Sequence, residues 1–234
     1  HYISYTPSMM DFPLNSVLSK SLLEKEAWNS GLIKIYDVIS NDFLYGDPYN
    51  LVVFAGNHDM ERIYNQVNEQ YPLYEMAMTY VYTTRGIPQV YYGTEILLKG
   101  PADHGSLRTD FPGGWNSDKI NGFNGLGLTN EQMEAQLFTK QLLNWRKNSL
   151  AVTKGTLTHY LPQNGVYVYF RKYKNELVMV LINNNASGAS VSSERFYEIL
   201  DDKTQGISVR KKQVYNLKND IQVPGKTALI LDLQ

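Results

Sequence analysis

The sequence predicts an α/β region followed by an all-β domain, and three observations support this fold class. In the first 150 residues, the short apolar segments 51–55 and 87–93 alternate with helical patterns, which is typical of parallel βα units. After residue 152, aliphatic and aromatic residues alternate with Tyr and Arg, as in 166–171, and turns recur at short spacing. Both features are typical of an antiparallel β-sandwich. The strand-helix units are too few to close a (β/α)8 barrel, which takes about 250 residues. We therefore expect residues 1–150 to be a portion of a larger barrel and residues 151–234 to be a β-sandwich domain.

The first expected elements are a short strand at 8–11, which Pro13 ends, and a helix at 14–26. Apolar residues at steps of three and four then predict an amphipathic helix from Leu32 to Phe43. The apolar run 51–55 predicts a buried strand, and a polar stretch follows it.

A second helix and strand follow this polar stretch. The helix is expected from Pro72 to Thr84, and Arg85-Gly86 ends it because glycine readily takes the left-handed cap conformation. The strand is expected at 87–93. Residues 100–128 are rich in Gly, Asp and Asn, and loops of this length are usually functional or disordered.

A long helix and a set of strands complete the predicted elements. Thr129 to Gln132 matches a capping box that opens a helix ending near Lys147. Its expected apolar face consists of Met133, Leu137, Phe138, Leu142 and Trp145. The strands expected after it are 166–170, 177–182, 196–200, 214–217, 221–223 and 227–233.

Composition excludes several classes of partner. The 234 residues carry 22 Lys and Arg against 23 Asp and Glu, so nothing indicates a nucleic acid or an anionic membrane surface as a partner. No apolar run approaches the roughly 20 residues of a membrane span, and no cysteine is present for a disulfide or thiolate metal site. The sequence begins at His1 rather than Met, which suggests a processed or truncated chain.

The segment LVVFAGNHDMER, 51–62, carries the main candidate site. Its apolar run ends at Gly56, and Asn57, His58 and Asp59 follow where a barrel strand would deliver side chains into a cleft. We expect Arg62 to pair with Asp59, whose carboxylate could stabilise a developing cation or bind a sugar diol. An ordinary strand followed by an Asx turn is the alternative interpretation.

Other kinds of site find less support in the sequence. Glu95 is the other carboxylate expected at a strand end, although a buried charge bound to backbone or arginine explains it better than catalysis. His58 lacks an H-x-x-x-H partner for a metal, so no metal site is expected. No G-x-S-x-G elbow of a serine hydrolase occurs, and His159 is expected at the surface.

Four motifs resemble the alpha-amylase superfamily, glycoside hydrolase family thirteen. FAGNHDMER at 54–62 resembles the motif that ends barrel strand seven, and GIPQVYYGTE at 86–95 resembles the strand-eight motif. LRTDFPGGW at 107–115 and MDFPL at 10–14 are similar to the neopullulanase and cyclomaltodextrinase branch. The resemblance implies that the chain contains barrel strands six to eight and the C-terminal β-sandwich.

The resemblance also implies roles for the site residues. Asp59 corresponds to the catalytic carboxylate that stabilises the transition state, and His58 to the histidine that binds hydroxyls of the same sugar. Asn57 shapes the turn, and Arg62 occupies the motif's basic position. Arg108 and Trp115 lie after strand eight, where substrate contact is expected. A loop anchor packed into the protein is the alternative for Trp115.

The family's nucleophile and general acid have no counterpart in this sequence. The resemblance therefore implies a C-terminal fragment of a retaining hydrolase that cleaves α-1,4 bonds in starch-type glucans, and this fragment alone is expected to be inactive. No cofactor is expected here, because the family's calcium sites generally lie in the absent part. The expected partners are an alpha-glucan or maltooligosaccharide and either the missing barrel portion or another copy of the chain. A non-catalytic amylase-like scaffold that binds carbohydrate or another protein is the alternative function.

Overall fold

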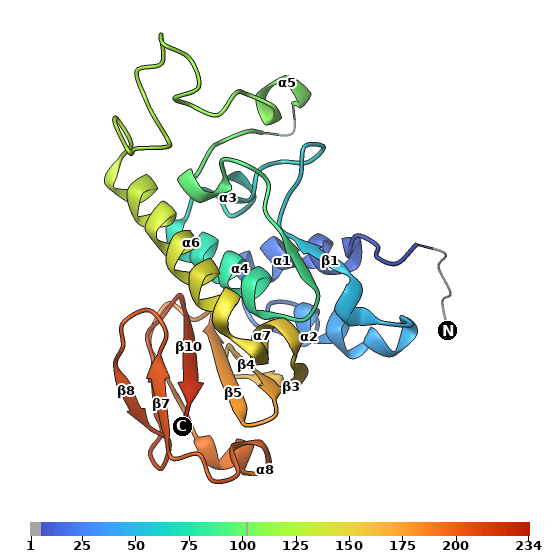
Figure 1. The fold of residues 1–234 in the computed structure, drawn as a ribbon. Coiled ribbons are helices and arrows are strands. Elements are labelled where there is room, and N and C mark those ends of the chain that lie inside the picture. The colour runs from blue at the N-terminus through green and yellow to red at the C-terminus, as the bar shows by residue number, and fades with distance from the viewer. Residues whose placement is uncertain (1–5, 102) are drawn as a thin grey trace.

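The computed structural model describes residues 6–101 and 103–234, in which a helical α/β part is followed by a mainly antiparallel part (Figure 1). The helices of the first part are α1 (Phe12–Leu23), α2 (Ile33–Ser40), α3 (Ile63–Gln66), α4 (Tyr71–Thr83), α5 (His104–Leu107), α6 (Asn130–Asn148) and α7 (Leu150–Lys154). The short 3-10 helices are η1 (Asp42–Leu44), η2 (Pro48–Asn50) and η3 (Thr94–Ile96), and the strands are β1 (Val52–Phe54) and β2 (Ile87–Gln89).

Strands β1 and β2 are parallel neighbours, with Val52 opposite Ile87. On the other side of β1, the expected strand at 8–11 is reduced to a parallel bridge between Met10 and Val52. These three segments and the helices between them have the strand-helix order predicted from the sequence. The predicted fold class is therefore confirmed, although β2 is shorter than the expected strand at 87–93.

Helix α1 begins two residues before the predicted start because Asp11 caps it. The Asp11 carboxylate accepts a hydrogen bond from the backbone N–H of Leu14, and Pro13 lies within the first turn, where its missing N–H costs nothing. Helix α2 ends at Ser40, before the predicted Phe43, whose ring is exposed on η1. The spacing of apolar residues therefore predicted both helices correctly but not the residues at which they begin and end.

Helix α4 is buried almost all round rather than on one face. Residues 76–83 of this helix are all buried, because α4 packs between the other helices of the first part and the C-terminal sheet. Helix α6 has the predicted capping box, formed by Thr129 and Gln132. The predicted apolar face of α6 is partly wrong, since Met133 and Leu137 are exposed while Phe138 and Leu142 are buried.

The C-terminal part contains a six-stranded antiparallel sheet in the order β3-β4-β5-β10-β7-β8 and a two-stranded pair β6-β9. Its strands are β3 (Thr156–Gln163), β4 (Val166–Tyr173), β5 (Glu176–Asn183), β6 (Ala189–Val191), β7 (Gln205–Ser208), β8 (Val214–Asn216), β9 (Ile221–Val223) and β10 (Thr227–Leu233). The predicted strand at 196–200 is wrong. There η4 (Ser193–Phe196) and α8 (Tyr197–Leu200) bury Phe196 against the outer face of the sheet.

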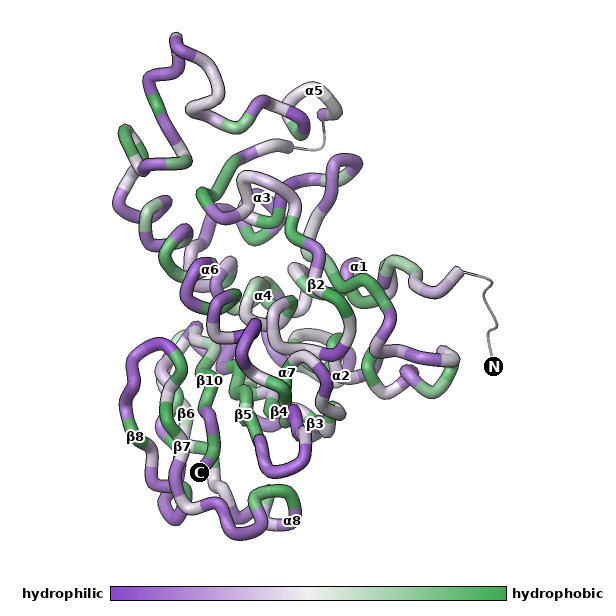
Figure 2. The backbone as a smooth tube through the Cα atoms, in the orientation of Figure 1, coloured by the Kyte–Doolittle hydropathy of each residue, from purple (hydrophilic) through white to green (hydrophobic). Residues whose placement is uncertain are grey.

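Both faces of this sheet are buried. Val168 and Phe170 of β4 belong to a core with η4 and α8, whereas Tyr167 and Tyr169 belong to a core with α4. Figure 2 shows hydrophobic strands joined by hydrophilic turns. The predicted domain boundary near residue 150 stays a prediction, because the second core extends from α1 across it to β10.

Two arginines join the C-terminal end of α4 to the rest of the molecule. Arg171 of β4 donates to the carbonyls of Thr83, Thr84 and Gly155, and Arg146 of α6 donates to the carbonyl of Tyr82. The carbonyls at a helix C-terminus lack partners within the helix and carry partial negative charge. Cationic donors from two other elements thus satisfy this end.

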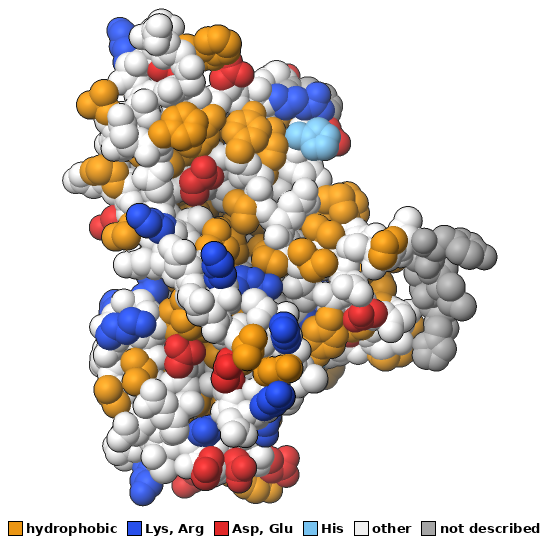
Figure 3. All heavy atoms as spheres, viewed as in Figure 1, with side chains coloured by type: hydrophobic (Ala, Val, Ile, Leu, Met, Phe, Trp, Pro, Cys, Tyr) orange, Lys and Arg blue, Asp and Glu red, His pale blue; other side chains and the backbone are white. Residues whose placement is uncertain are grey.

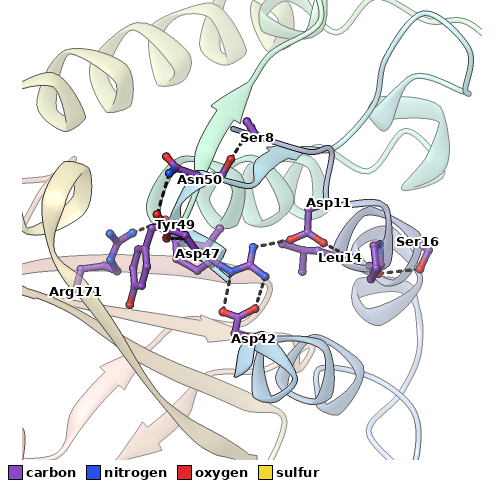
Figure 4. Close-up of polar contacts among 12 residues, drawn as sticks. Ser8, Asp11, Leu14, Ser16, Asp42, Asp47, Tyr49, Asn50 and Arg171 are labelled. Carbon is purple, nitrogen blue, oxygen red and sulfur yellow. Dashed lines mark hydrogen bonds and ion pairs between the residues drawn. The ribbon is translucent and has the colours of Figure 1, made fainter. Parts of the chain in front are cut away.

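A third arginine, Arg85, lies directly after α4 and forms a buried ion cluster. Its guanidinium is 2.5 Å from the Asp11 carboxylate and 2.6 Å from that of Asp42, and its side chain is 1% exposed. Figure 4 shows the Asp11 and Asp42 carboxylates meeting at this cluster from α1 and η1. The cluster therefore ties together three chain segments, namely the start of α1, η1 and the end of α4.

His159 is predicted to make stability depend on pH. The sequence suggested a surface position for His159. The residue is instead half-buried, because it packs on Tyr36 and forms a hydrogen bond with Tyr167. Burial lowers its pKa from 6.5 to about 4, so between these values the unfolded state binds more protons than the folded state. The stabilising contribution is complete above pH 6.5 and is lost as pH falls toward 4.

The measurement is urea unfolding of the wild type and of His159→Gln at several pH values from 7.5 to 4. We expect the difference in unfolding free energy between the two proteins to shrink as pH falls. A difference that is constant across this range would contradict the assignment.

Candidate active site

Strand β1 positions the candidate site. Val53, Phe54 and Ala55 are buried, the strand ends at Phe54, and Gly56 leads into the turn that follows. The Asn57 side-chain oxygen then accepts the backbone N–H of Asp59 at 2.8 Å, which forms the Asx turn considered from the sequence. Asn57 is buried, and its side-chain oxygen is used in this turn. The turn leaves the next two side chains, His58 and Asp59, exposed to solvent.

The Asp59 carboxylate lies between a histidine and an arginine. One oxygen is 2.7 Å from Nη2 of Arg108 and the other is 3.2 Å from Nε2 of His58. The Asp59 and His58 side chains are 56% and 60% exposed, so the carboxylate is open to a ligand. The structure thus brings together three residues predicted for the site, Arg108 from a segment 49 residues away.

The expected pairing of Arg62 with Asp59 is wrong. Arg62 is 3% exposed, and its guanidinium donates to the carbonyls of Tyr92 at 2.7 Å and Leu107 at 2.9 Å. It turns inward because β1 is followed by a turn that sends the chain back toward α3, which begins at Ile63. Arg62 therefore has no direct access to a ligand beside Asp59, and Arg108 takes the place expected for it.

Trp115 is exposed rather than packed as a loop anchor. Its side chain is 65% exposed, and its indole N–H donates to Asp110 on the same loop at 2.9 Å. Asp118 accepts the backbone N–H groups of Gly113 and Trp115, which gives the loop a defined shape. In Figure 3, hydrophobic side chains are exposed on the upper part of the molecule, where this loop lies, as well as lower on the same face. The ring is thus available for contact with a ligand.

Glu95 lies on η3, in the segment that follows β2. Its carboxyl group is half-buried, and this burial raises its pKa above the ordinary value although Arg62 opposes the shift. The alternative of a buried charge near backbone and arginine, favoured from the sequence, describes this environment. Glu95 is therefore better placed to support the loop after β2 than to meet a ligand.

Sequence reasoning missed the two tyrosines that support the site. The Arg62 guanidinium lies over the rings of Tyr91 and Tyr92, at 4.6 and 5.1 Å from their centroids. Tyr91 donates to the carbonyl of Leu107, and Tyr92 donates to that of Thr109. The paired tyrosines in VYYG were the available signal, but nothing local reveals which segment they contact.

Within residues 6–101 and 103–234, no group of three or more His, Cys, Asp or Glu side chains is placed to hold a metal ion. In the same part of the chain, no helix has the length and apolar character needed to cross a membrane. The exposed groups at the site are instead a carboxylate, an imidazole, a guanidinium and an indole. Such groups recognise hydroxyls by hydrogen bonds and the faces of sugar rings by stacking.

Sequence comparisons relate the chain to glucan-active proteins. Residues 157–232 match the family model described as cyclo-malto-dextrinase C-terminal domain. The cyclomaltodextrin glucanotransferase of Thermoanaerobacterium thermosulfurigenes is 29% identical over 180 residues, which are 77% of this chain and 22% of that protein. That of Bacillus sp. strain 17-1 is 30% identical over 143 residues, or 61% of this chain and 18% of that protein. The chain thus spans about a fifth of the length of these relatives.

Solved structures agree on the fold. The alpha-amylase of Geobacillus thermoleovorans, complexed with acarbose, matches with a TM-score of 0.74 and 23% identity over 97% of this chain and 48% of that one. The alpha-amylase of H. orenii matches with a TM-score of 0.71 and 20% identity over 97% and 49% of the two chains. The resemblance extends across both parts of the chain described above.

Proposed function

Because this chain is a member of the alpha-amylase family, we propose that it supplies one corner of the active site of a retaining alpha-glucan hydrolase. The observation that carries the proposal is the exposed Asp59 carboxylate at the end of β1, held between His58 and Arg108. The proposed substrates are α-1,4-linked glucans of the starch type and their maltooligosaccharides. This choice rests on the glucan-related names of the relatives and on the neopullulanase-like motifs of the loop that carries Trp115.

Asp59 is the proposed catalytic residue. Cleavage of a glycosidic bond builds positive charge on the anomeric carbon and ring oxygen, and a fixed carboxylate nearby stabilises that charge more in the transition state than in the ground state. Its two oxygens also suit two adjacent sugar hydroxyls. The resting contacts with Arg108 and His58 hold the carboxylate in one orientation before substrate arrives.

The surrounding residues have distinct proposed roles. His58 donates to a hydroxyl of the same sugar, and Arg108, about half exposed, binds hydroxyls at the rim. Trp115 stacks on a sugar further from the cleaved bond. Asn57 fixes the turn and stays out of contact with substrate.

We further propose that the nucleophile and the general acid come from a barrel portion beyond this chain, and that without that portion the chain pairs with another copy of itself. In the part of the chain that the structure describes, β2 has β1 as its hydrogen-bonded neighbour, and Ile87 on it is 47% exposed. An uncovered strand edge with apolar side chains readily pairs with further strands. The chain by itself is expected to associate, and sedimentation showing a stable folded monomer would count against this.

The test is to express a longer protein that carries the upstream barrel portion and incubate it with maltoheptaose and with cyclomaltodextrins. We expect both to be shortened with retention of the α configuration in the products, measured by NMR at early times. Binding of these sugars without any cleavage would overturn the proposal and favour the amylase-like scaffold.

A further inference from the structure

We propose that Arg62 is a positioning residue that fixes Gly100 and Leu107, on either side of α5, so that Arg108 reaches Asp59. The effect of Arg62 on catalysis rests on the proposed function, whereas its effect on the position of the loop does not. The contact between Arg108 and Asp59 joins two loops, one after β1 and one after β2. Arg108 approaches Asp59 only if the second loop is fixed against the first.

Arg62 contacts the second loop at three points. Its backbone N–H donates to the carbonyl of Gly100 at 3.0 Å, and its guanidinium donates to the carbonyls of Tyr92 and Leu107. Gly100 and Leu107 are the two ends of the segment that carries α5, and both are buried. A single side chain and its amide therefore fix the segment immediately before Arg108.

The packing around Arg62 supports the same role. A Cβ added to Gly100 would lie 3.2 Å from Cδ of Arg62 and 3.0 Å from the carbonyl oxygen of Ser106, so the loop passes close against the arginine stem. Tyr91 and Tyr92 cover the guanidinium, and Tyr91 donates to the same Leu107 carbonyl. The planar fork of arginine suits two carbonyls in fixed directions, which lysine cannot match.

The remaining contacts lead directly from this clamp to the carboxylate. Leu107 is fully buried, and the next residue, Arg108, donates to Asp59 at 2.7 Å and to the His58 carbonyl at 3.2 Å. Arg108 is about half exposed, so its own packing holds it weakly. The order of its side chain therefore depends on how firmly Leu107 is held.

The first experiment measures hydrogen exchange in the chain as it is. We expect Arg62→Met to speed exchange of the amides of Leu107 and Arg108 by about 10- to 100-fold, because two charge-assisted hydrogen bonds that hold the loop are lost. Arg62→Lys, which keeps the charge, should restore only part of the protection. The matched control is Arg146→Met, which removes a half-buried arginine bound to one carbonyl elsewhere in the chain and should leave the Leu107 and Arg108 amides unchanged.

Unchanged exchange of the Leu107 and Arg108 amides in Arg62→Met would overturn the inference. If Arg62→Met does not fold, Arg62→Lys tests the same contact, since a single ammonium cannot reproduce the two bonds to the Tyr92 and Leu107 carbonyls. Unaltered protection of the Leu107 and Arg108 amides in Arg62→Lys would overturn the inference as well.

The second experiment measures kcat in the longer active protein. If Arg62 acts through Arg108, then Arg62→Met and Arg108→Met each lower kcat by about tenfold, and the double variant is within about twofold of Arg108→Met. Losses that multiply would show that Arg62 does not act through Arg108. Failure of the proposed function would appear separately, as an Asp59→Asn variant of unchanged activity whose loop still loosens when Arg62 is replaced.

Discussion

Replacing Asp11 with alanine is expected to lower the free energy of unfolding by about 3–5 kcal/mol, because it breaks a buried ion pair. Asp11 is fully buried and pairs with Arg85, which is itself buried. Removing the carboxylate leaves a buried guanidinium with Asp42 as its remaining partner and also removes the cap on α1. The cost is large because a charge out of water needs its full set of partners.

Two controls separate these contributions in urea unfolding measurements. Asp11→Asn keeps an oxygen that can cap Leu14 but loses the charge, so its loss should be smaller than that of Asp11→Ala. Glu69→Ala removes the exposed pair with Lys99 and should cost no more than about 1 kcal/mol. A loss below about 1 kcal/mol for Asp11→Ala would contradict the role given to the cluster.

Replacing Asp59 with asparagine is expected to lower kcat for maltooligosaccharide cleavage in the longer protein on the order of 10³-fold. Asparagine has nearly the same shape, so the turn that Asn57 shapes persists, but it carries no charge to stabilise the cationic transition state. KM should change much less than kcat, because the lost interaction is strongest in the transition state.

The matched control is Asp110→Asn on the loop that carries Trp115. Asp110 accepts the Trp115 indole N–H rather than lying beside Asp59, so its replacement should change kcat by no more than a few-fold. Activity of Asp59→Asn within a few-fold of the parent would show that the role assigned to Asp59 is wrong.

Local sequence predicted the parts of the site that depend on local chemistry. Gly56 and Asn57 marked the end of β1 and the turn that exposes His58 and Asp59, because strand ends and Asx turns are properties of adjacent residues. The partner of Asp59 could not be read in this way. Arg62 is nearer in sequence, but Arg108 is nearer in space, and only the path of the loop after β2 decides between them.

The fold shows the same division between local pattern and tertiary context. Alternation in β4 was visible, yet Tyr167, Tyr169 and Arg171 are as buried as their neighbours because α4 covers their face. The segment 196–200 has the apolar character of a strand, but residues 197–200 form a short helix. This helix covers the core on the outer face of the sheet. The burial of a strand face and the choice between strand and helix depend on the elements that pack against a segment. The residues of the segment itself do not specify those elements.

A crystal structure of the longer protein, with a bound maltooligosaccharide that spans the cleavage site, tests the role proposed for Asp59. We expect the Asp59 oxygens to lie within hydrogen-bond distance, about 2.5–3.0 Å, of two hydroxyls of the sugar at the cleaved bond. His58 should contact the same sugar, with Arg62 still buried against the carbonyls of Tyr92 and Leu107. A sugar bound at the cleavage site with Asp59 turned away from it, still paired with Arg108, would show that Asp59 does not have this role.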